Sequence, residues 1–433
     1  MGLSYAHGAI QWLSTDAVST TYVISGLSFQ PKALRFWWVG IHSATDASSE
    51  TVNECRGVGF ATSTSNRRCV GSFSQDTAAT STCGTVARND AIACMTDGAG
   101  GSTAELDVDA ITSDGFVAIV DDPADQDVTV YWETWGGTDI TVATCGDWEE
   151  PTVTGDLDVT ATGLMAGATD QVLMLAGVQS SAAINTAEAE ASGMVVSFVT
   201  GTGIAQVMVG GSADHNSLAM DTDGWCHSGE CASMVQKAGA AVLETRASWT
   251  QWNTDGFRLN YATTSLNTRK SIFLAMKGGS WQAGAYTIDG STGGATATVS
   301  GLAFTPIGVS LIGRMTTEQA SNVTTANDRL GFGSGSSTSS RRSMGVLDED
   351  ATASSVCEID TTIQYDQVLC FPSTAGGLQA AYDINAMNSD GFQIIVDTAG
   401  GVASEWQGYV AFGDAPVAPS GEKLMGRMLV MNF

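Results

Sequence analysis

The chain has 433 residues, of which 43% are hydrophobic and 15% charged, and its formal net charge is −28. Its length predicts two to four domains, each able to bury a core. The negative charge repels phosphate backbones, which excludes nucleic acid as a partner. No apolar run is long enough to span a membrane, so no membrane association is expected. The first residues lack the basic and apolar regions of a signal peptide, so we expect either synthesis in the cytoplasm or a secretion signal that is missing or of another kind.

The first third of the chain is rich in Thr, Val and Gly, which predicts strands joined by tight turns. Gly26-Leu27 ends one predicted strand and precedes the apolar run Ala33–Trp38. Asp114-Gly115-Phe116 indicates a turn whose Phe points inward at the start of the next strand. A closing strand is expected between Val128 and Gly137.

The same signals return in the same order in the rest of the chain. Gly-Leu recurs at 163–164 and 301–302, the apolar run at 171–175 and 308–312, Asp-Gly-Phe at 255–257 and 390–392, and the closing strand at 271–279 and 408–413. Between them, the Ala- and Glu-rich stretch Ala182–Ser192 is a candidate helix.

Ordered signals at nearly constant spacing predict three tandem copies of one domain. The apolar runs are too short for amphipathic helices, so each copy is predicted to be an all-β, jelly-roll-like β-sandwich. The predicted domains cover residues 1–147, 148–279 and 280–414. A C-terminal extension, 415–433, contains a candidate final strand at Lys423–Phe433, which could dock on the third domain or pair with a neighbouring molecule.

The cysteines are the sharpest chemical feature of the sequence. Each predicted domain carries a pair before its Asp-Gly-Phe turn, and the first domain carries three more cysteines, Cys55, Cys69 and Cys145. The four candidate disulfides are Cys83–Cys94, Cys226–Cys231, Cys357–Cys370 and Cys55–Cys69, which leaves Cys145 free. Such a bridge would stabilise each loop by about 2–3 kcal/mol. The alternatives are buried thiols that only pack, or a zinc site built from the second pair with His215 and His227.

Two arginine pairs recur at matching positions in the first and third copies. Arg67-Arg68 and Arg341-Arg342 each follow a Gly-Phe dipeptide and lie in Ser- and Thr-rich segments. A guanidinium pair could bind the carboxylates of a neighbouring subunit or an acidic glycan. The simpler alternative is an exposed loop.

No motif for nucleophilic, metal-dependent or nucleotide-dependent catalysis is present, so no enzyme activity and no cofactor are predicted. A glycosidase would need two carboxylates across a groove. Glu133 and Glu405 lie beside tryptophans and are the candidates, although we favour the simpler explanation that both belong to closing strands of alternating core and surface residues. The acidic loop 121–127 could bind calcium or stay solvated.

Three features together, Gly-Leu-x-Phe-x-Pro at residues 26–31 and 301–306, a later Asp-Gly-Phe, and an aromatic closing strand, resemble a repeat in virion proteins of tailed bacteriophages. The second copy matches less well, because Ala166-Gly167-Ala168 replaces Phe-x-Pro. The resemblance implies an exterior, non-enzymatic role on the particle, as a tail appendage or a head decoration or fibre. It implies other virion proteins and further copies of this chain as partners, with adhesion to a host-surface glycan as an additional role.

Oxidised cysteines without a signal peptide would be explained by a virion protein that is made in the host cytoplasm and exposed after lysis. Two alternatives remain open at this point. One is a protein that binds or degrades glycans, and the other is a secreted bacterial adhesin.

Overall fold

The computed structural model describes residues 2–40, 48–51, 54–75, 83–98, 100–180, 182–189, 192–201, 205–213, 222–235, 243–319, 324–325, 327–349, 357–362, 367–374 and 377–414. These residues form strands joined by turns and contain no helix, which confirms the all-β fold class. No helix among them could therefore cross a membrane.

The strands fall into three groups along the chain, which we call the first, second and third units. The first unit contains β1 (Leu3–Trp12), β2 (Thr21–Ile24), β3 (Pro31–Val39), β4 (Ser48–Thr51), β5 (Glu54–Ser63), β6 (Asn66–Ser74), β7 (Cys83–Arg88), β8 (Ala93–Thr96), β9 (Ser102–Thr112), β10 (Gly115–Asp122) and β11 (Val128–Gly137). The second unit contains β12 (Val142–Glu149), β13 (Gly155–Thr160), β14 (Gln171–Val178), β15 (Glu188–Ala189), β16 (Ser192–Thr200), β17 (Ala205–Ala213), β18 (Thr222–Ser228), β19 (Met234–Val235), β20 (Leu243–Asn253), β21 (Gly256–Thr263) and β22 (Lys270–Lys277). The third unit contains β23 (Ser280–Ile288), β24 (Thr296–Val299), β25 (Pro306–Gly313), β26 (Thr324–Thr325), β27 (Asp328–Ser337), β28 (Ser340–Asp348), β29 (Cys357–Thr362), β30 (Leu369–Pro372), β31 (Leu378–Asn388), β32 (Gly391–Thr398) and β33 (Glu405–Gly413).

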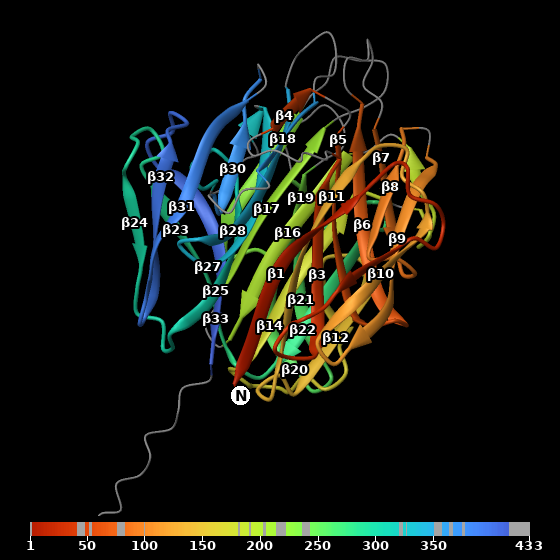
Figure 1. The fold of residues 1–433 in the computed structure, drawn as a ribbon, viewed down its shortest axis with the longest axis horizontal. Coiled ribbons are helices and arrows are strands. Elements are labelled where there is room, and N and C mark those ends of the chain that lie inside the picture. The colour runs from red at the N-terminus through yellow and green to blue at the C-terminus, as the bar shows by residue number, and fades with distance from the viewer. Residues whose placement is uncertain are drawn as a thin grey trace, which may run out of the picture.

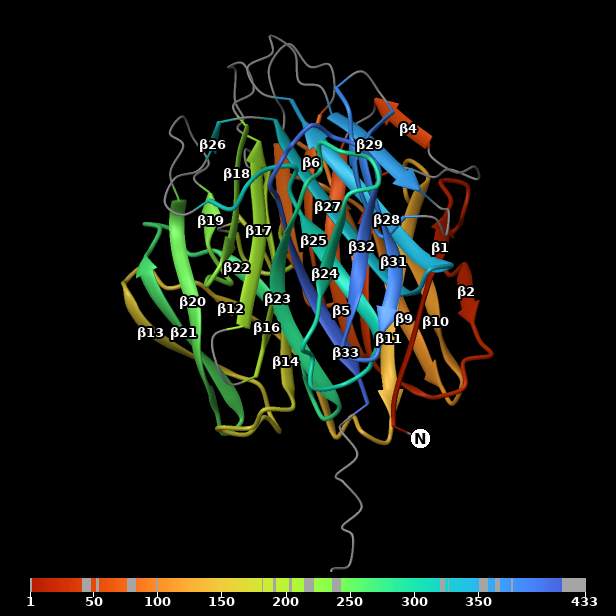
Figure 2. The ribbon, with the colours of Figure 1, turned by 90° about the vertical axis from the view of Figure 1, so that its left-hand side faces the viewer.

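Each unit is a sandwich of one seven-stranded and one four-stranded antiparallel sheet. The seven-stranded sheets have the orders β1-β11-β3-β5-β6-β7-β15, β12-β22-β14-β16-β17-β18-β26 and β23-β33-β25-β27-β28-β29-β4. The four-stranded sheets have the orders β2-β10-β9-β8, β13-β21-β20-β19 and β24-β32-β31-β30. Corresponding strands thus occupy the same place in all three sandwiches, and Figure 2 shows the four-stranded sheets as the outer layer on three sides of the body.

The last strand of every seven-stranded sheet comes from a different unit. β15 of the second unit pairs with β7 of the first, and β26 of the third unit pairs with β18 of the second. β4 of the first unit pairs with β29 of the third, which returns the exchange to the beginning of the chain. The three exchanges therefore run in one cyclic direction and close the units into a single body (Figure 1).

The Gly-Leu and Asp-Gly-Phe signals meet at one end of each sandwich. Gly26, Gly163 and Gly301 all have positive φ, at 81°, 93° and 79°. Their amides donate to the turn carboxylates of Asp114, Asp255 and Asp390, over 3.2, 2.7 and 3.3 Å respectively. Each Gly-Leu signal and its Asp-Gly-Phe signal therefore form one local structure, in which a glycine with a left-handed backbone donates a hydrogen bond to the turn aspartate.

One predicted boundary and one predicted helix change in the structure. β12 crosses the predicted division between residues 147 and 148 and pairs along its whole length with β22, so it belongs to the second unit. The candidate helix Ala182–Ser192 is not formed in the described residues 182–189, which turn and then form the exchanged strand β15. The pairing of β15 with a neighbouring unit overrides the local helix propensity of Ala and Glu. The extension 415–433, with its predicted final strand, lies outside the described residues.

Candidate functional site: the core shared by three units

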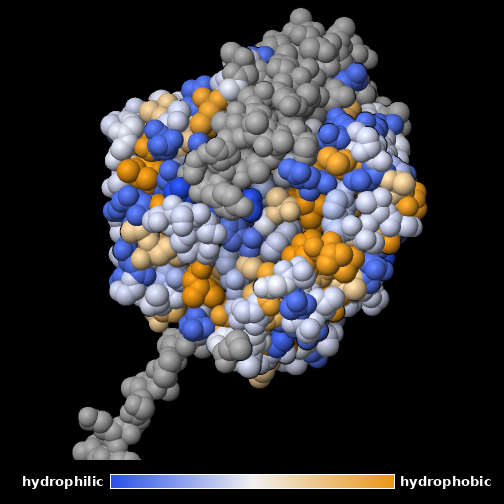
Figure 3. Space-filling model, viewed as in Figure 1, coloured by the Kyte–Doolittle hydropathy of each residue, from blue (hydrophilic) through white to orange (hydrophobic). Residues whose placement is uncertain are grey.

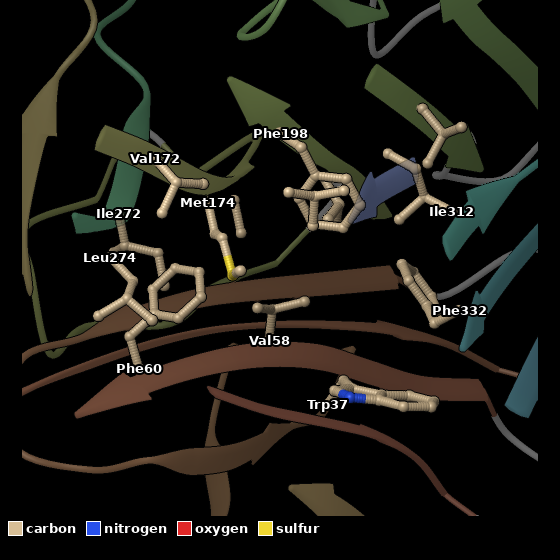
Figure 4. Close-up of a cluster of buried hydrophobic side chains, with 14 of the residues drawn as sticks. Trp37, Val58, Phe60, Val172, Met174, Phe198, Ile272, Leu274, Ile312 and Phe332 are labelled. Carbon is tan, nitrogen blue, oxygen red and sulfur yellow. The ribbon is translucent and has the colours of Figure 1, made fainter. Parts of the chain in front are cut away.

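The seven-stranded sheets are buried on both faces. Along β3, Ala33, Trp37 and Val39 belong to a central cluster, whereas Leu34 and Phe36 belong to the interior of the first sandwich. The strand consequently reads as a continuous apolar run and not as an alternating one. Figure 4 shows the central cluster, in which residues from all three units meet, among them Trp37, Val58, Phe60, Val172, Met174, Phe198, Ile272, Leu274, Ile312 and Phe332.

A buried ion pair lies within this shared core. Arg35 of β3 and Glu133 of β11 are paired across the sheet, with Nη1 and Oε2 2.9 Å apart and the side chains 1% and 0% exposed. Glu133 Oε1 also accepts hydrogen bonds from the hydroxyl of Tyr5 at 2.9 Å and from Ser310 Oγ of the third unit at 2.5 Å. The Arg35 guanidinium lies 5.1 Å from the ring centroid of Phe198 in the second unit. One polar cluster thus joins all three units.

Burial dominates the electrostatics of this pair. It raises the pKa of Glu133, although Arg35, Ser310 and Tyr5 all favour the ionised form. It also lowers the pKa of Arg35 in spite of the nearby carboxylate. Both shifts mean that the site holds its charges only because they are paired, so loss of either partner should be costly.

A second buried ionic cluster joins the first and third units. Asp328 of β27 lies 3.3 Å from Arg56 of β5 and 3.3 Å from Arg314, and all three residues are buried. Burial raises the pKa of Asp328, while Arg56 and Arg314 oppose that shift. The neighbouring β17 and β18 leave room for these groups: a Cβ on Gly211 would lie 1.9 Å from Asp328, and one on Gly224 would lie 1.7 Å from Arg314. A side chain at either position of the second unit would therefore displace these ionic groups.

The predicted arginine pairs are engaged inside the chain and do not form exposed loops. Arg67 and Arg341 take matching roles, since each ties its seven-stranded sheet to the facing four-stranded sheet through Asp107 at 2.5 Å and Asp383 at 3.5 Å. Arg68 pairs with Asp147 of the second unit. Arg342 lies 5.8 Å from the ring centroid of Tyr131 in the first unit. Arg68 thus meets a carboxylate of a neighbouring unit within one molecule, while binding to a neighbouring subunit or an acidic glycan stays a prediction.

The predicted disulfides do not form among the cysteines that the structure describes. Cys55, Cys69, Cys83, Cys94, Cys145, Cys226, Cys231 and Cys370 are all buried thiols. Cys69 and Cys94 instead approach each other across the first sandwich, with their sulfurs 3.2 Å apart. The side chain of Cys357 lies outside the described residues, so the Cys357–Cys370 prediction is not tested.

Two other pairs are separated by the sheet geometry. Cys226 packs in the shared core, whereas Cys231 packs inside the second sandwich. Their positions in different cores also separate the first two ligands of the zinc alternative, and His215 lies outside the described residues. Cys55 pairs with Phe73 and Cys69 with Gly59, so the two cysteines are out of register on β5 and β6. Within the described residues, no cluster of three or more His, Cys, Asp or Glu could hold a metal ion.

The two candidate glycosidase carboxylates are inaccessible. Glu133 lies in the shared core, and Glu405 is also 0% exposed. Glu405 accepts from the Tyr382 hydroxyl at 2.5 Å and from Gln407 at 3.1 Å, and burial raises its pKa to about 7. Neither carboxylate can meet a polysaccharide without unfolding of its sheet.

The described surface offers shallow hollows and scattered apolar groups. One hollow of about 520 Å³ lies between the first two units and is lined by Pro31, Thr62, Ile111, Ile140 and Val142 among others. Exposed large apolar side chains are dispersed at Val18, Val23, Val153, Met165 and Leu266. On the face drawn in Figure 3, hydrophobic residues form small groups separated by hydrophilic ones.

Comparison with known proteins adds little to this geometry. No family model and no curated protein matches the chain. Among solved structures, a protein of Nitrosomonas europaea assigned provisionally as AttH aligns over 89% of this chain and 93% of its own, at 8% identity and with a TM-score of 0.14. So low a score carries no argument about fold or function.

Proposed function

We propose that this chain is a non-enzymatic structural protein on the exterior of a tailed-bacteriophage particle, either a capsid decoration or fibre, or a tail appendage. The observation that carries the proposal is the cyclic closure of three sandwiches of one strand order around one core. In this proposal other virion proteins and further copies of the chain are the partners, and adhesion to a host-surface glycan is an added role.

The cyclic arrangement supports a place in a symmetric particle. Three sandwiches of the same strand order around a common core present three outer four-stranded sheets, one from each unit. Such an arrangement is matched to positions of threefold symmetry, which symmetric assemblies provide repeatedly. Three similar surfaces on one rigid body would also allow multivalent binding, in which weak contacts add to a useful avidity.

The charge distribution supports an exterior position. Most of the described Arg and Lys side chains pair with carboxylates of the same chain, as at Arg67, Arg88, Arg258, Arg269 and Lys270. The excess of 46 acidic over 18 basic residues is therefore left largely on the outer surface. A surface of this sign is repelled by packaged nucleic acid and favours solubility after release from the host.

The buried thiols suit synthesis in the reducing host cytoplasm, and release by lysis would expose the particle afterwards. Glycan degradation has less support, because Glu133 and Glu405 are both buried.

The test is localisation on purified particles. Mass spectrometry of gradient-purified virions should detect the chain in constant stoichiometry with the major capsid protein, and immunogold labelling should place it on the head surface or the tail. Its absence from intact particles would overturn the proposal. A glycan array with the purified chain tests the adhesive role separately, since decoration without glycan binding leaves the structural role intact.

A further inference from the structure

The first and third units, unlike the other two pairs of neighbouring units, are not joined by a short chain segment. A short segment, 138–141, joins β11 to β12, and residues 278–279 join β22 to β23. The third and first units lie at opposite ends of the chain and have no such direct link. Their association depends on strand pairing and side-chain contacts alone.

Within the described residues, that pairing is the longest of the three exchanges. β4 pairs with β29 through four residue pairs, from Ser48 with Thr361 to Thr51 with Glu358. β15 and β26 each pair through only two residues. Without β4, β29 would be the open edge of its sheet, and an open edge is a template for a strand from another chain.

The same interface contains matched polar contacts. Arg56 of the first unit meets Asp328 of the third at 3.3 Å, and Ser310 of the third unit donates to Glu133 of the first. The rings of Tyr5 and Phe412 pack edge to face with centroids 4.6 Å apart. These contacts specify which two units can associate here, because a mismatched pair would leave buried charges unpaired.

We propose that the β29 edge is also a binding site for β4 of a second copy of this chain, so that copies can link head to tail through their first and third units. The residues that meet would be the same within one molecule and between two, so contact energy does not choose between the closed and linked forms. The choice depends on the concentration of chains relative to the effective concentration of the tethered units. A head-to-tail contact that does not close on itself generates a linear array.

The other two exchanges are expected to stay within one molecule. The segments 138–141 and 278–279 are short and hold consecutive units beside each other at high effective concentration. Opening is therefore expected between the third and first units, where no short segment acts. This inference does not depend on the virion role.

The experiment places a disulfide across each exchange in the full chain. Ser49→Cys with Asp360→Cys joins β4 to β29 at directly opposed positions. Thr85→Cys with Glu188→Cys joins β7 to β15 and is the matched control. Each protein is unfolded with reductant and refolded at low micromolar or near-millimolar concentration. It is then oxidised under native conditions by oxidised glutathione and analysed on non-reducing gels and by light scattering. Ser49→Cys alone reports any bond to a native thiol.

Refolding at low concentration should give cross-linked monomers for both pairs. Refolding at high concentration should give oligomers of both chains by light scattering. On the non-reducing gel, the S49C/D360C chain should then give a ladder of covalent oligomers. The T85C/E188C chain should give only monomers on that gel, because its disulfide forms within one molecule. The proposal is overturned if S49C/D360C stays monomeric on the gel at every concentration or does not cross-link at all. It is equally overturned if the control pair gives as much ladder.

Discussion

The shared core and the three sandwich interiors are built from the same strands but with different chemistry. The interior of the third sandwich is lined mainly by apolar side chains such as Leu311, Phe371 and Phe392, and its Arg341–Asp383 pair joins two sheets of one unit. The shared core contains the Arg35–Glu133 pair and borders the Arg56–Asp328 pair. Apolar contacts are non-directional, so a sandwich interior can form the unit without specifying its neighbours.

Buried charges act differently because they tolerate few partners. An ion pair out of water contributes little net stability but makes mismatched arrangements costly. The difference between the two regions therefore suggests a division of labour: the sandwich interiors stabilise each unit, and the polar groups of the shared core select the order of the units.

The largest expected effect comes from breaking one buried pair. Arg35→Met should lower the free energy of unfolding by about 3–5 kcal/mol, because Glu133 would stay buried without its cation. Adding Glu133→Gln should recover much of that loss, since Gln can still accept from Tyr5 and Ser310. Chemical denaturation measures both. The control is Arg258→Met at the solvent-exposed pair with Asp158, where a much smaller loss is expected because water screens the two charges. Equal losses at the two sites would contradict the comparison.

A closer contrast is available on one strand. Leu311 and Ile312 are adjacent in β25 and both 0% exposed, but Leu311 faces the third sandwich and Ile312 the shared core. Each change to Ala should cost about 2–5 kcal/mol by leaving a cavity. Hydrogen exchange should then separate them: Leu311→Ala should weaken protection mainly in β30–β32, and Ile312→Ala should weaken it in the seven-stranded sheets of all three units. The same exchange pattern for both would show that the two cores are not distinct.

The pH dependence of stability provides a third contrast, between Glu133 and Glu405. Glu133 is paired with Arg35, whereas the described partners of Glu405 are the uncharged Tyr382 and Gln407. The pKa of Glu405 is raised to about 7, so the folded state holds a proton that the unfolded state releases near pH 4.5. Stability should therefore fall as pH rises from about 4.5 to about 7, by on the order of 3 kcal/mol. Glu405→Gln should remove the contribution of Glu405 to that slope while keeping the bond to Tyr382. Thermal unfolding at pH 5 and pH 7.5 tests this prediction; an unchanged slope in the variant would assign it to other groups, such as Glu150, whose pKa is also about 7.

Much of the local structure could be predicted from the sequence. The apolar runs at Ala33–Trp38 and Gln171–Leu175 form β3 and β14, because short runs bounded by turn residues favour buried strands. The shared core could also have been inferred, since runs apolar on both faces require cover on both sides. Arg35 and Glu133 stand out as lone charges within such runs.

The exchanged strands could not be predicted in the same way. β15 and β26 are two residues long, and their partners lie in other units, so no local pattern marks them. The cysteine prediction was wrong for the described pairs because position in the sequence does not report the face of a strand: Cys226 and Cys231 are five residues apart and lie in different cores.

The smallest expected effect concerns the left-handed glycine of the Gly-Leu signal. This glycine occurs in all three units and lies outside the shared core and the sandwich interiors. Gly26 and Gly301 have positive φ and no atom within 4 Å of an added Cβ. Gly301→Ala should therefore cost only about 1–2 kcal/mol, entirely from the left-handed backbone. Gly333→Ala is the contrast: its Cβ would lie 1.7 Å from the Val368 carbonyl oxygen, so a larger loss is expected from steric overlap. Denaturation midpoints rank the two. If Gly301→Ala were the more damaging, the hydrogen bond to Asp390 would have a role in joining the sheets beyond that of a surface turn, and the division between cores and periphery would need redrawing.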